Sequence, residues 1–254
     1  MTRKNTFRIM ILLSLCLFIF SSAAPADVYI KKIRQTETSS PKVEKSQKPI
    51  DEKGVTWLTK DKMREDMGNT SIIVRLDQKK IYMNIDHETK TYSEIDLPID
   101  MEKLIPPEAK QLAQLIEMAH IFKDTGEFMK IRGWNCKKYL VEITTSMMGM
   151  NMPISLIIWT SKDLGVDLSA YLKLQGEILS TNPFTKDIAI DFKRIEGFPV
   201  VIEFAMAMPG MESKYREEVV SVDGKKAPAG TYDLPQGYTK IPYNPFGLTS
   251  PEIK

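Results

Sequence analysis

Methionine is concentrated in two short stretches of the sequence. One is TTSMMGMNMPISLIIW at residues 144–159, and the other is AMAMPGM at residues 205–211. A thioether is a soft ligand that suits Cu(I), and it is also a flexible apolar group that adapts to ligands of different shape. The two stretches could bind copper, line a site for a hydrophobic ligand, or fill an irregular core. The sequence leaves these three interpretations open.

Other residues that could perform chemistry lack suitable partners in the sequence. His87 and His120 show no metal-ligand spacing, and HETKT at residues 87–91 is not an H-E-x-x-H motif. Cys136 is expected to be a small buried apolar residue rather than a nucleophile. No G-x-S-x-G motif and no phosphate-binding glycine loop occurs. We therefore predict no enzymatic activity, no metal site built on histidine, and no cofactor.

Alternation along the predicted strands indicates which side chains share a face. A tight hairpin turn in the first stretch is expected to pair Met147 with Met152, and a turn in the second to pair Met211 with Met208. If the strands carrying the two stretches are neighbours, they are antiparallel, and both hairpins point to one rim. Glu217 then faces inward, either as a polar group in the ligand space or as the sign of a register error. The predicted ligand-binding residues on this inner face are Met147, Met152, Ile154, Leu156, Phe204, Met206, Met208 and Met211.

The remaining periodicity predicts the elements that position this face. Short strands divided by polar turns occupy residues 56–97, which indicates an antiparallel meander. Apolar residues at spacings of three and four predict helices at residues 106–122, 167–181 and 183–195, with their apolar stripes against the sheet.

Residues 1–26 have the pattern of a cleaved signal peptide. Three basic residues precede an apolar run at residues 9–20, which is too short to span a membrane, and Ala24-Pro25-Ala26 is a cleavage pattern. Leu15 before Cys16 argues against a lipoprotein signal. We therefore predict cleavage near Ala26 and export to the periplasm.

The mature chain, residues 27–254, is predicted to be a single domain with a mobile polar loop at residues 39–54 and an extended Pro/Gly-rich tail at residues 227–254. Removal of the signal leaves 32 basic residues against 33 acidic ones. This balance does not imply a basic face, so nucleic acid is not an expected partner. Cys136 is then the single cysteine, and no internal disulfide is expected.

Several segments, among them TWLTKDKMRED, GWNCKKYLVEI, MNMPISLIIWTSKDLGVD, GFPVVIEFAMAMPGMES and TYDLPQGY, resemble an uncharacterised family of exported bacterial proteins. That family is similar in pattern to the periplasmic outer-membrane lipoprotein carriers, the lipoprotein localisation factor superfamily. The resemblance implies an α+β fold, in which a strongly curved antiparallel sheet forms an unclosed β-barrel and helices cover its concave face. Carriers of that kind shelter acyl chains between sheet and helices. No catalytic motif belongs to the pattern, so no functional residue is transferred.

The leading hypothesis is a periplasmic binding or carrier protein that holds a lipid, an acyl chain or a lipoprotein, with a transient envelope-protein partner. One alternative is a Met-rich Cu(I)-binding periplasmic protein, and another is a non-enzymatic envelope scaffold. The sequence identifies neither the ligand nor the oligomeric state.

Overall fold

The computed structural model describes residues 27–39, 50–104, 116–147, 150–165, 171, 190–208 and 210–243. The strands of the N-terminal half are β1 (Val28–Ser39), β2 (Ile50–Leu58), β3 (Lys62–Met67), β4 (Thr70–Arg75), β5 (Lys80–Asp86) and β6 (Thr91–Asp96). Those of the C-terminal half are β7 (Ile116–Ile131), β8 (Trp134–Met147), β9 (Met150–Ser161), β10 (Phe198–Met208), β11 (Met211–Gly224) and β12 (Thr239–Lys240). The short helices are η1 (Leu76–Gln78) and α2 (Met101–Leu104).

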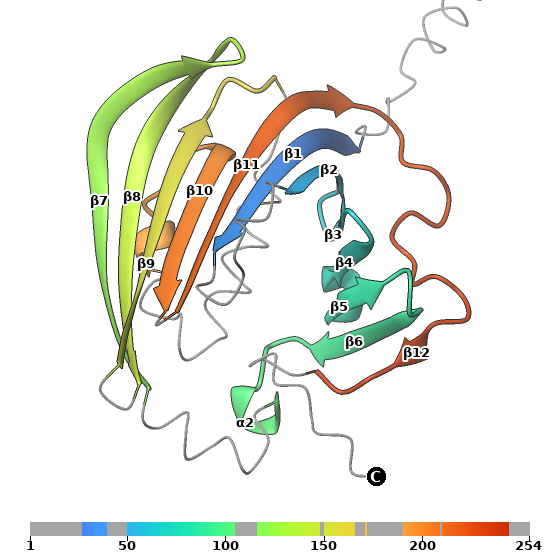
Figure 1. The fold of residues 1–254 in the computed structure, drawn as a ribbon. Helices are drawn as coiled ribbons and strands as arrows, with labels where there is room; N and C mark the ends of the chain where they lie inside the picture. Colours follow the sequence, from blue (N-terminus) through green and yellow to red (C-terminus); the bar gives the residue numbers. More distant parts are fainter. Residues whose placement is uncertain are drawn as a thin grey trace, which may run out of the picture.

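These strands form one 12-stranded sheet in the order β12-β6-β5-β4-β3-β2-β1-β11-β10-β9-β8-β7. All pairings are antiparallel except the short parallel pairing of β12 with β6. The sheet curves strongly, and its two edges stay apart (Figure 1). The predicted curved, unclosed sheet is therefore correct, as is the meander that runs through β2–β6.

The predicted α+β class is wrong, because the described residues are almost entirely β. Residues 116–122 of the predicted helix 106–122 belong to β7, while residues 106–115 lie outside the described residues. Of the helix expected at 167–181, only Tyr171 is described; of the one at 183–195, residues 190–195 are described and only 190–192 are helical. Helices that cover the concave face are therefore not part of the described structure.

The error at residues 116–122 has a clear physical cause. The sequence IEMAHIF fits a helical stripe, but it also alternates, with Met118, His120 and Phe122 on one side. β7 pairs with β8 along nearly its whole length, and those non-local hydrogen bonds select the extended form.

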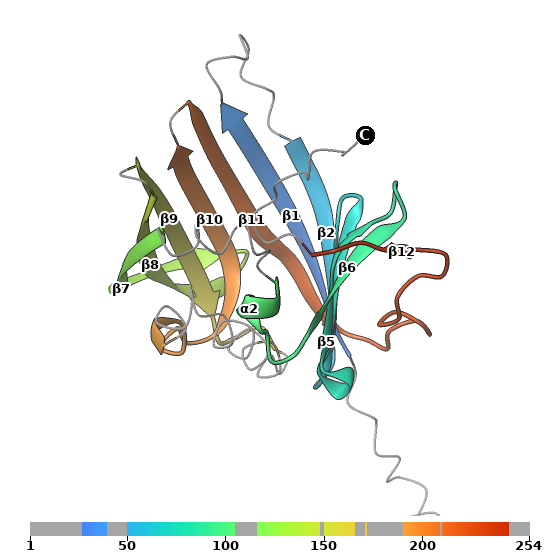
Figure 2. The same ribbon diagram turned by 90° about the horizontal axis from the view of Figure 1, so that it is seen from below.

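The meander and the C-terminal strands are joined by β1, which pairs with β2 on one side and with β11 on the other. Val28 at the start of β1 lies opposite Gly224 at the end of β11. Figure 2 shows β9, β10, β11, β1 and β2 running side by side as one broad surface. The first strand of the described chain thus pairs with β11 at the centre of the sheet. β2 begins at Ile50, so residues 50–54 of the segment expected to be a loop are extended, while residues 40–49 lie outside the described part.

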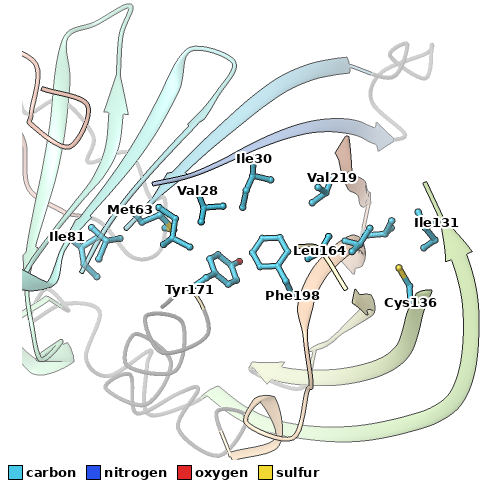
Figure 3. Packing of buried hydrophobic residues seen from close by; sticks show 14 of the residues in the cluster. Val28, Ile30, Met63, Ile81, Ile131, Cys136, Leu164, Tyr171, Phe198 and Val219 are labelled. Atoms are coloured by element: carbon cyan, nitrogen blue, oxygen red, sulfur yellow. The ribbon is translucent and has the colours of Figure 1, made fainter. Parts of the chain in front are cut away.

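A hydrophobic core lies on the inner face of the curved sheet, where Tyr171 and Phe198 pack with their ring centroids 4.7 Å apart (Figure 3). Its strand residues include five that are each at most 2% exposed, namely Ile30, Leu58, Val74, Val200 and Val219. Burial of each such side chain contributes about 1.5–3 kcal/mol. Cys136, 0% exposed, belongs to the same cluster, which confirms the interpretation of this cysteine as a buried apolar residue.

The described part of the C-terminal tail lies against the outside of the meander over residues 225–238, before β12 pairs with β6 at the sheet edge and Tyr243 packs against the hydrophobic core. Arg75 pairs with Asp233, with Nη1 3.1 Å from Oδ1, and also donates to the carbonyl oxygen of Tyr232. Tyr238 contacts His87 through a hydrogen bond of 2.7 Å between its hydroxyl and Nδ1. Within the described residues, no helix is both long and apolar enough to cross a membrane.

Candidate functional site

Part of the inner face consists of large apolar side chains that are only half-buried, and we call it the open wall. Its members come from three neighbouring strands, β8, β9 and β10. Pairing places Ile154 between Ile143 and Met206, and in the next row it places Leu156 opposite Phe204. The open wall comprises Ile143, Met152, Ile154, Leu156, Phe204 and Met206. Five of the eight predicted ligand-binding residues therefore lie together on one half-exposed surface.

The other predicted residues, Met147, Met208 and Met211, lie at the strand ends next to the open wall. Met211 pairs with Met208, as predicted. The first hairpin register is wrong, because Met147 pairs with Met150 and Met152 lies opposite Thr145. A slip of two residues keeps each side chain on its predicted face, since side chains alternate with a period of two. The side chains of Met147 and Met208 lie outside the described part of the structure.

Farther along the same strands, away from the methionine hairpins, lies a group of buried apolar residues that we call the closed apolar base. Tyr139, Val141 and Ile158 are at most 3% exposed, and Phe192 and Ile195 pack against them. The backbone N–H of Glu196 donates to the hydroxyl of Tyr139 over 3.2 Å, which ties this segment to β8. The open wall thus adjoins packed residues farther along the same strands, and its exposure is confined to the end of the strands near the methionine hairpins.

Four charged side chains form a buried ion cluster on the inner face, at the centre of the sheet. Nζ of Lys32 lies 2.8 Å from Oε2 of Glu65 and 3.0 Å from Oε1 of Glu217. Nε of Arg34 donates to Oε2 of Glu217 over 3.1 Å, and Thr56 donates to Glu65 over 3.2 Å. The Lys32 side chain is only 4% exposed and that of Glu217 10%. Two cations and two carboxylates balance in charge, which is what burial of so many charges requires.

The pKa values of these groups follow from burial and from their partners. Burial alone would lower the pKa of Lys32, but the charges of Glu65 and Glu217 outweigh it and hold the pKa above its ordinary value. Burial alone would raise the pKa of Glu65, but Lys32 and Arg34 hold it below the usual range. Burial raises the pKa of the neighbouring Tyr171 to about 12. Lys32 and Glu65 are therefore charged throughout the neutral range.

An aromatic contact joins the open wall to the ion cluster. The ring of Phe204 stacks on that of Tyr215 at a centroid distance of 5.0 Å and an interplanar angle of 15°. The guanidinium carbon of Arg34 on β1 lies 5.3 Å from the ring centroid of Tyr215 on β11. Arg34 is the most exposed member of the cluster, with 28% of its side chain accessible. The inner face thus changes from apolar to charged within three neighbouring side chains.

The ion cluster was only partly anticipated from the sequence. Glu217 was expected to face inward, and the structure shows that its inward position is a polar group on the inner face and not a register error. Lys32 and Arg34 were missed, although they continue the alternation of Val28 and Ile30 toward the inner face. The signal that could have revealed them is that these charged residues occupy the same alternating positions of the strand as the apolar residues that face inward.

Comparison with known proteins identifies the family. Residues 37–238 match the family described as "Domain of unknown function (DUF4412)". The chain belongs to this DUF4412 family. No curated protein matches the sequence. Among solved structures, the chain is similar to a DUF1329 family protein from Desulfovibrio piger at 11% identity and a TM-score of 0.28, over 86% of this chain and 94% of that one.

A hollow of about 490 Å³ lies across β7–β11 of this DUF4412 protein, mainly on the face opposite the open wall. Its lining includes the small residues Ala119, Ser155 and Ala205. Ile154 and Met206 also border it, but most of its lining side chains occupy ladder positions that point away from the inner face. This hollow is therefore not the inner ligand space that the methionine pattern predicts.

His87 and Ser71 have the spacing of a catalytic pair but not its proton arrangement. Nε2 of His87 lies 2.6 Å from Oγ of Ser71, and Ser71 is also hydrogen-bonded to a carboxylate oxygen of Asp66. A carboxylate only accepts, so the Ser71 hydroxyl donates to Asp66 and must accept from His87, which then carries its proton on Nε2. Such a histidine cannot act as the base for Ser71, which is itself only 2% exposed. The contact instead holds the tail through Tyr238.

Among the described residues of this DUF4412 protein, metal ligands of the usual kind are not gathered either. In the part of the chain that the structure describes, no three side chains of His, Cys, Asp or Glu are placed to share one metal ion. His120 contacts Asp191, with Nε2 3.0 Å from Oδ2, and this pair lies on the inner face of β7. The open wall and the adjoining ion cluster therefore form the candidate functional site.

Proposed function

We propose that this DUF4412 protein is a binding or carrier protein for a hydrophobic ligand, whose apolar part lies against the open wall. The observation that carries the proposal is the contiguity of six large apolar side chains from β8, β9 and β10, all left half-exposed on the inner face. A contiguous exposed apolar surface on a folded domain typically marks a site for a ligand or partner. Met152 and Met206 would let this surface adapt to ligands of different shape.

The ligand class that fits best is a lipid or acyl chain with a polar end. The open wall meets Tyr215 and the partly exposed guanidinium of Arg34 at the edge facing the ion cluster. A polar head group could contact the accessible part of the Arg34 side chain at this edge, whereas a purely apolar ligand would make no polar contact with it. The acyl chain of a lipoprotein would use the same contacts. The proposed role is one of binding and transfer in the periplasm, without catalysis.

The proposal is tested with a fluorescent fatty acid and three variants of full-length, exported protein. Met206→Asp places a charge on the open wall and should abolish binding, whereas Met206→Leu keeps an apolar side chain and should bind as the natural protein does. Ala207→Asp is the matched control, because this neighbour points to the opposite face. Binding that survives Met206→Asp, or is lost equally in Ala207→Asp, would contradict the open wall as the site.

Native mass spectrometry of protein purified from the periplasm addresses the identity of the ligand. A retained lipid supports the carrier proposal, and a retained copper ion supports the alternative Cu(I) function. Protein that neither retains a ligand nor binds an added fatty acid would indicate an envelope scaffold.

The Cu(I) alternative rests on the cross-strand pairs at the rim. Met147 pairs with Met150 and Met208 with Met211, so four methionines lie at the ends of adjoining hairpins. Thioether sulfur is a soft ligand that suits Cu(I), so this pairing of methionine positions motivates the alternative. Replacement of Met147, Met150, Met208 and Met211 together by Leu should abolish copper uptake if this alternative is correct, and it should leave fatty-acid binding intact if the carrier proposal is correct.

A further inference from the structure

β7 forms one edge of the sheet, and its first nine residues are unusually regular for an edge strand. Residues 116–124 pair with β8 without interruption, and the first bulge follows Asp124. No described strand pairs with the other side of β7. Edge strands in soluble proteins are usually short, bulged or densely charged, because their free N–H and C=O groups otherwise pair with another chain. The segment 116–124 has little of this protection.

The side chains of this segment are apolar in the middle and charged toward both ends. Ile121 is 64% exposed and Met118 38%. Glu117 and Lys123 are also exposed, and neither forms an ion pair with a described residue. One acidic and one basic residue thus lie on the same face of the strand, three positions on either side of His120.

This arrangement is self-complementary. Two copies of an edge strand can pair antiparallel about a two-fold axis perpendicular to the sheet. For the side-chain faces to match, one residue must lie directly opposite the same residue of the second copy, with the axis midway between them. With His120 on the axis, Glu117 lies opposite Lys123 of the second copy, and this ion pair occurs twice. Ala119 lies opposite Ile121 of the second copy, so the exposed isoleucine is covered. A register centred on Ile121 would instead set Asp124 against Met118.

We propose that the chain forms a two-fold homodimer through antiparallel pairing of residues 116–124 of β7, centred on His120. The pairing would supply roughly one main-chain hydrogen bond per residue pair and would extend the two sheets into one. Glu117 and Lys123 set the register. The interface uses the edge of the sheet and leaves the open wall accessible, so this inference is independent of the carrier function.

Charge exchange tests the register in solution. The full-length exported protein should be a dimer by light scattering coupled to size exclusion. Lys123→Glu sets two acidic residues against each other at both ends of the interface and should yield monomer, as should Glu117→Lys. The double variant Glu117→Lys/Lys123→Glu restores opposite charges and should restore the dimer. Lys130→Glu, a charge reversal on β7 outside the paired segment, is the matched control and should remain dimeric.

A cysteine placed on the two-fold axis tests the geometry separately. Residues opposite each other in an antiparallel pair have Cα atoms about 4.5–5.5 Å apart, a distance that a disulfide can bridge. His120→Cys should therefore form a covalent dimer on mild oxidation, while Met118→Cys, which faces Phe122 of the second copy, should not. Cys136 is buried and does not compete. Natural protein that stays monomeric at every soluble concentration, or a folded double charge variant that stays monomeric, would overturn the proposal.

Discussion

The hydrophobic core and the closed apolar base, together called the closed core, lie on the same inner face as the open wall. The closed core and the open wall share strands, yet their side chains are covered to different degrees. On β10, Val200 is 1% exposed, whereas Phe204 and Met206 farther along the strand are half-buried. On β9, Ile158 is 3% exposed and Leu156 is half-buried. Both regions have the alternation of a buried face, so the pattern of the strand does not set the difference.

What differs is the set of side chains that reach each region from elsewhere in the fold. Phe198 and Tyr171 pack into the closed core from the side opposite β1 and β2 (Figure 3), and the ion cluster closes the centre of the sheet beside it. The open wall lacks such complete cover, and its residues retain contact with solvent. The closed core contributes mainly stability, because its apolar area is removed from water, while the open wall keeps apolar area available for a ligand.

The largest effect is expected in the ion cluster between the two regions. Glu217→Ala leaves Lys32 and Arg34 with incomplete partners in a buried setting and should lower the free energy of unfolding by about 3–5 kcal/mol. Glu203→Ala is the control, because Glu203 pairs with Arg216 where both side chains are more than a third exposed. It should cost about 0–1 kcal/mol in urea unfolding. Equal costs for the two variants would show that the cluster does not contribute to stability.

Matched leucine truncations compare the two regions directly. Leu58 is 1% exposed in the closed core, so Leu58→Ala should destabilise the protein by about 2–5 kcal/mol. Leu156 on the open wall is only half-buried, so Leu156→Ala should lower the free energy of unfolding by about 1 kcal/mol. Unfolding measured in urea for both variants gives the comparison. A cost for Leu156→Ala as large as that for Leu58→Ala would mean that the open wall is ordinary core.

The stability of the ion cluster should depend on pH in a defined direction. The pKa of Glu65 is lower in the folded state, so its contribution is complete above its unfolded pKa of about 4.3 and is lost as pH falls through the lowered folded value. The pKa of Lys32 is raised, so its contribution is complete below about pH 10.4 and is lost as pH rises through the folded value. A pKa difference of one corresponds to about 1.4 kcal/mol.

Urea unfolding across a pH series should therefore show a plateau between about pH 5 and pH 10, with losses on both sides. Glu65→Gln cannot ionise at this position and should flatten the acid limb. An acid limb of unchanged steepness in Glu65→Gln would assign the acid sensitivity to other carboxylates.

The smallest effect is expected for a conservative change on the open wall. Met206→Leu keeps the apolar volume, and a half-exposed site can accommodate the change of shape, so the cost should be well below about 1.5 kcal/mol. Thermal unfolding detects the difference, with the natural protein as the reference. A larger loss would show that Met206 fills a tightly packed position, as an irregular core requires.

Much of the candidate site could be predicted from local pattern alone. Alternation placed Ile154, Leu156, Phe204 and Met206 on one face, and it did so even though the first hairpin pairs Met147 with Met150 instead of Met152. A register error of two residues preserves the face, so this part of the prediction did not depend on the exact turn. The pairing of Met208 with Met211 followed from the short turn between them.

The helix expected at residues 106–122 shows what the local sequence pattern cannot predict. Residues 116–122 satisfy both a helical stripe and strand alternation, and only pairing with β8 decides between them. Local reasoning likewise did not predict whether an apolar side chain of the inner face is covered, because Ile158 and Leu156 occupy equivalent positions of β9 and only Ile158 is fully buried.

The sequence by itself determined which side chains share the inner face, because the two-residue period of a strand is a local property of the backbone. The tertiary structure alone decided which of those side chains meet. Arg34 and Glu217 are 183 residues apart in the chain and are joined only because β1 pairs with β11. That pairing brings the charges of two strands onto one buried patch, and their mutual neutralisation is what makes burial possible.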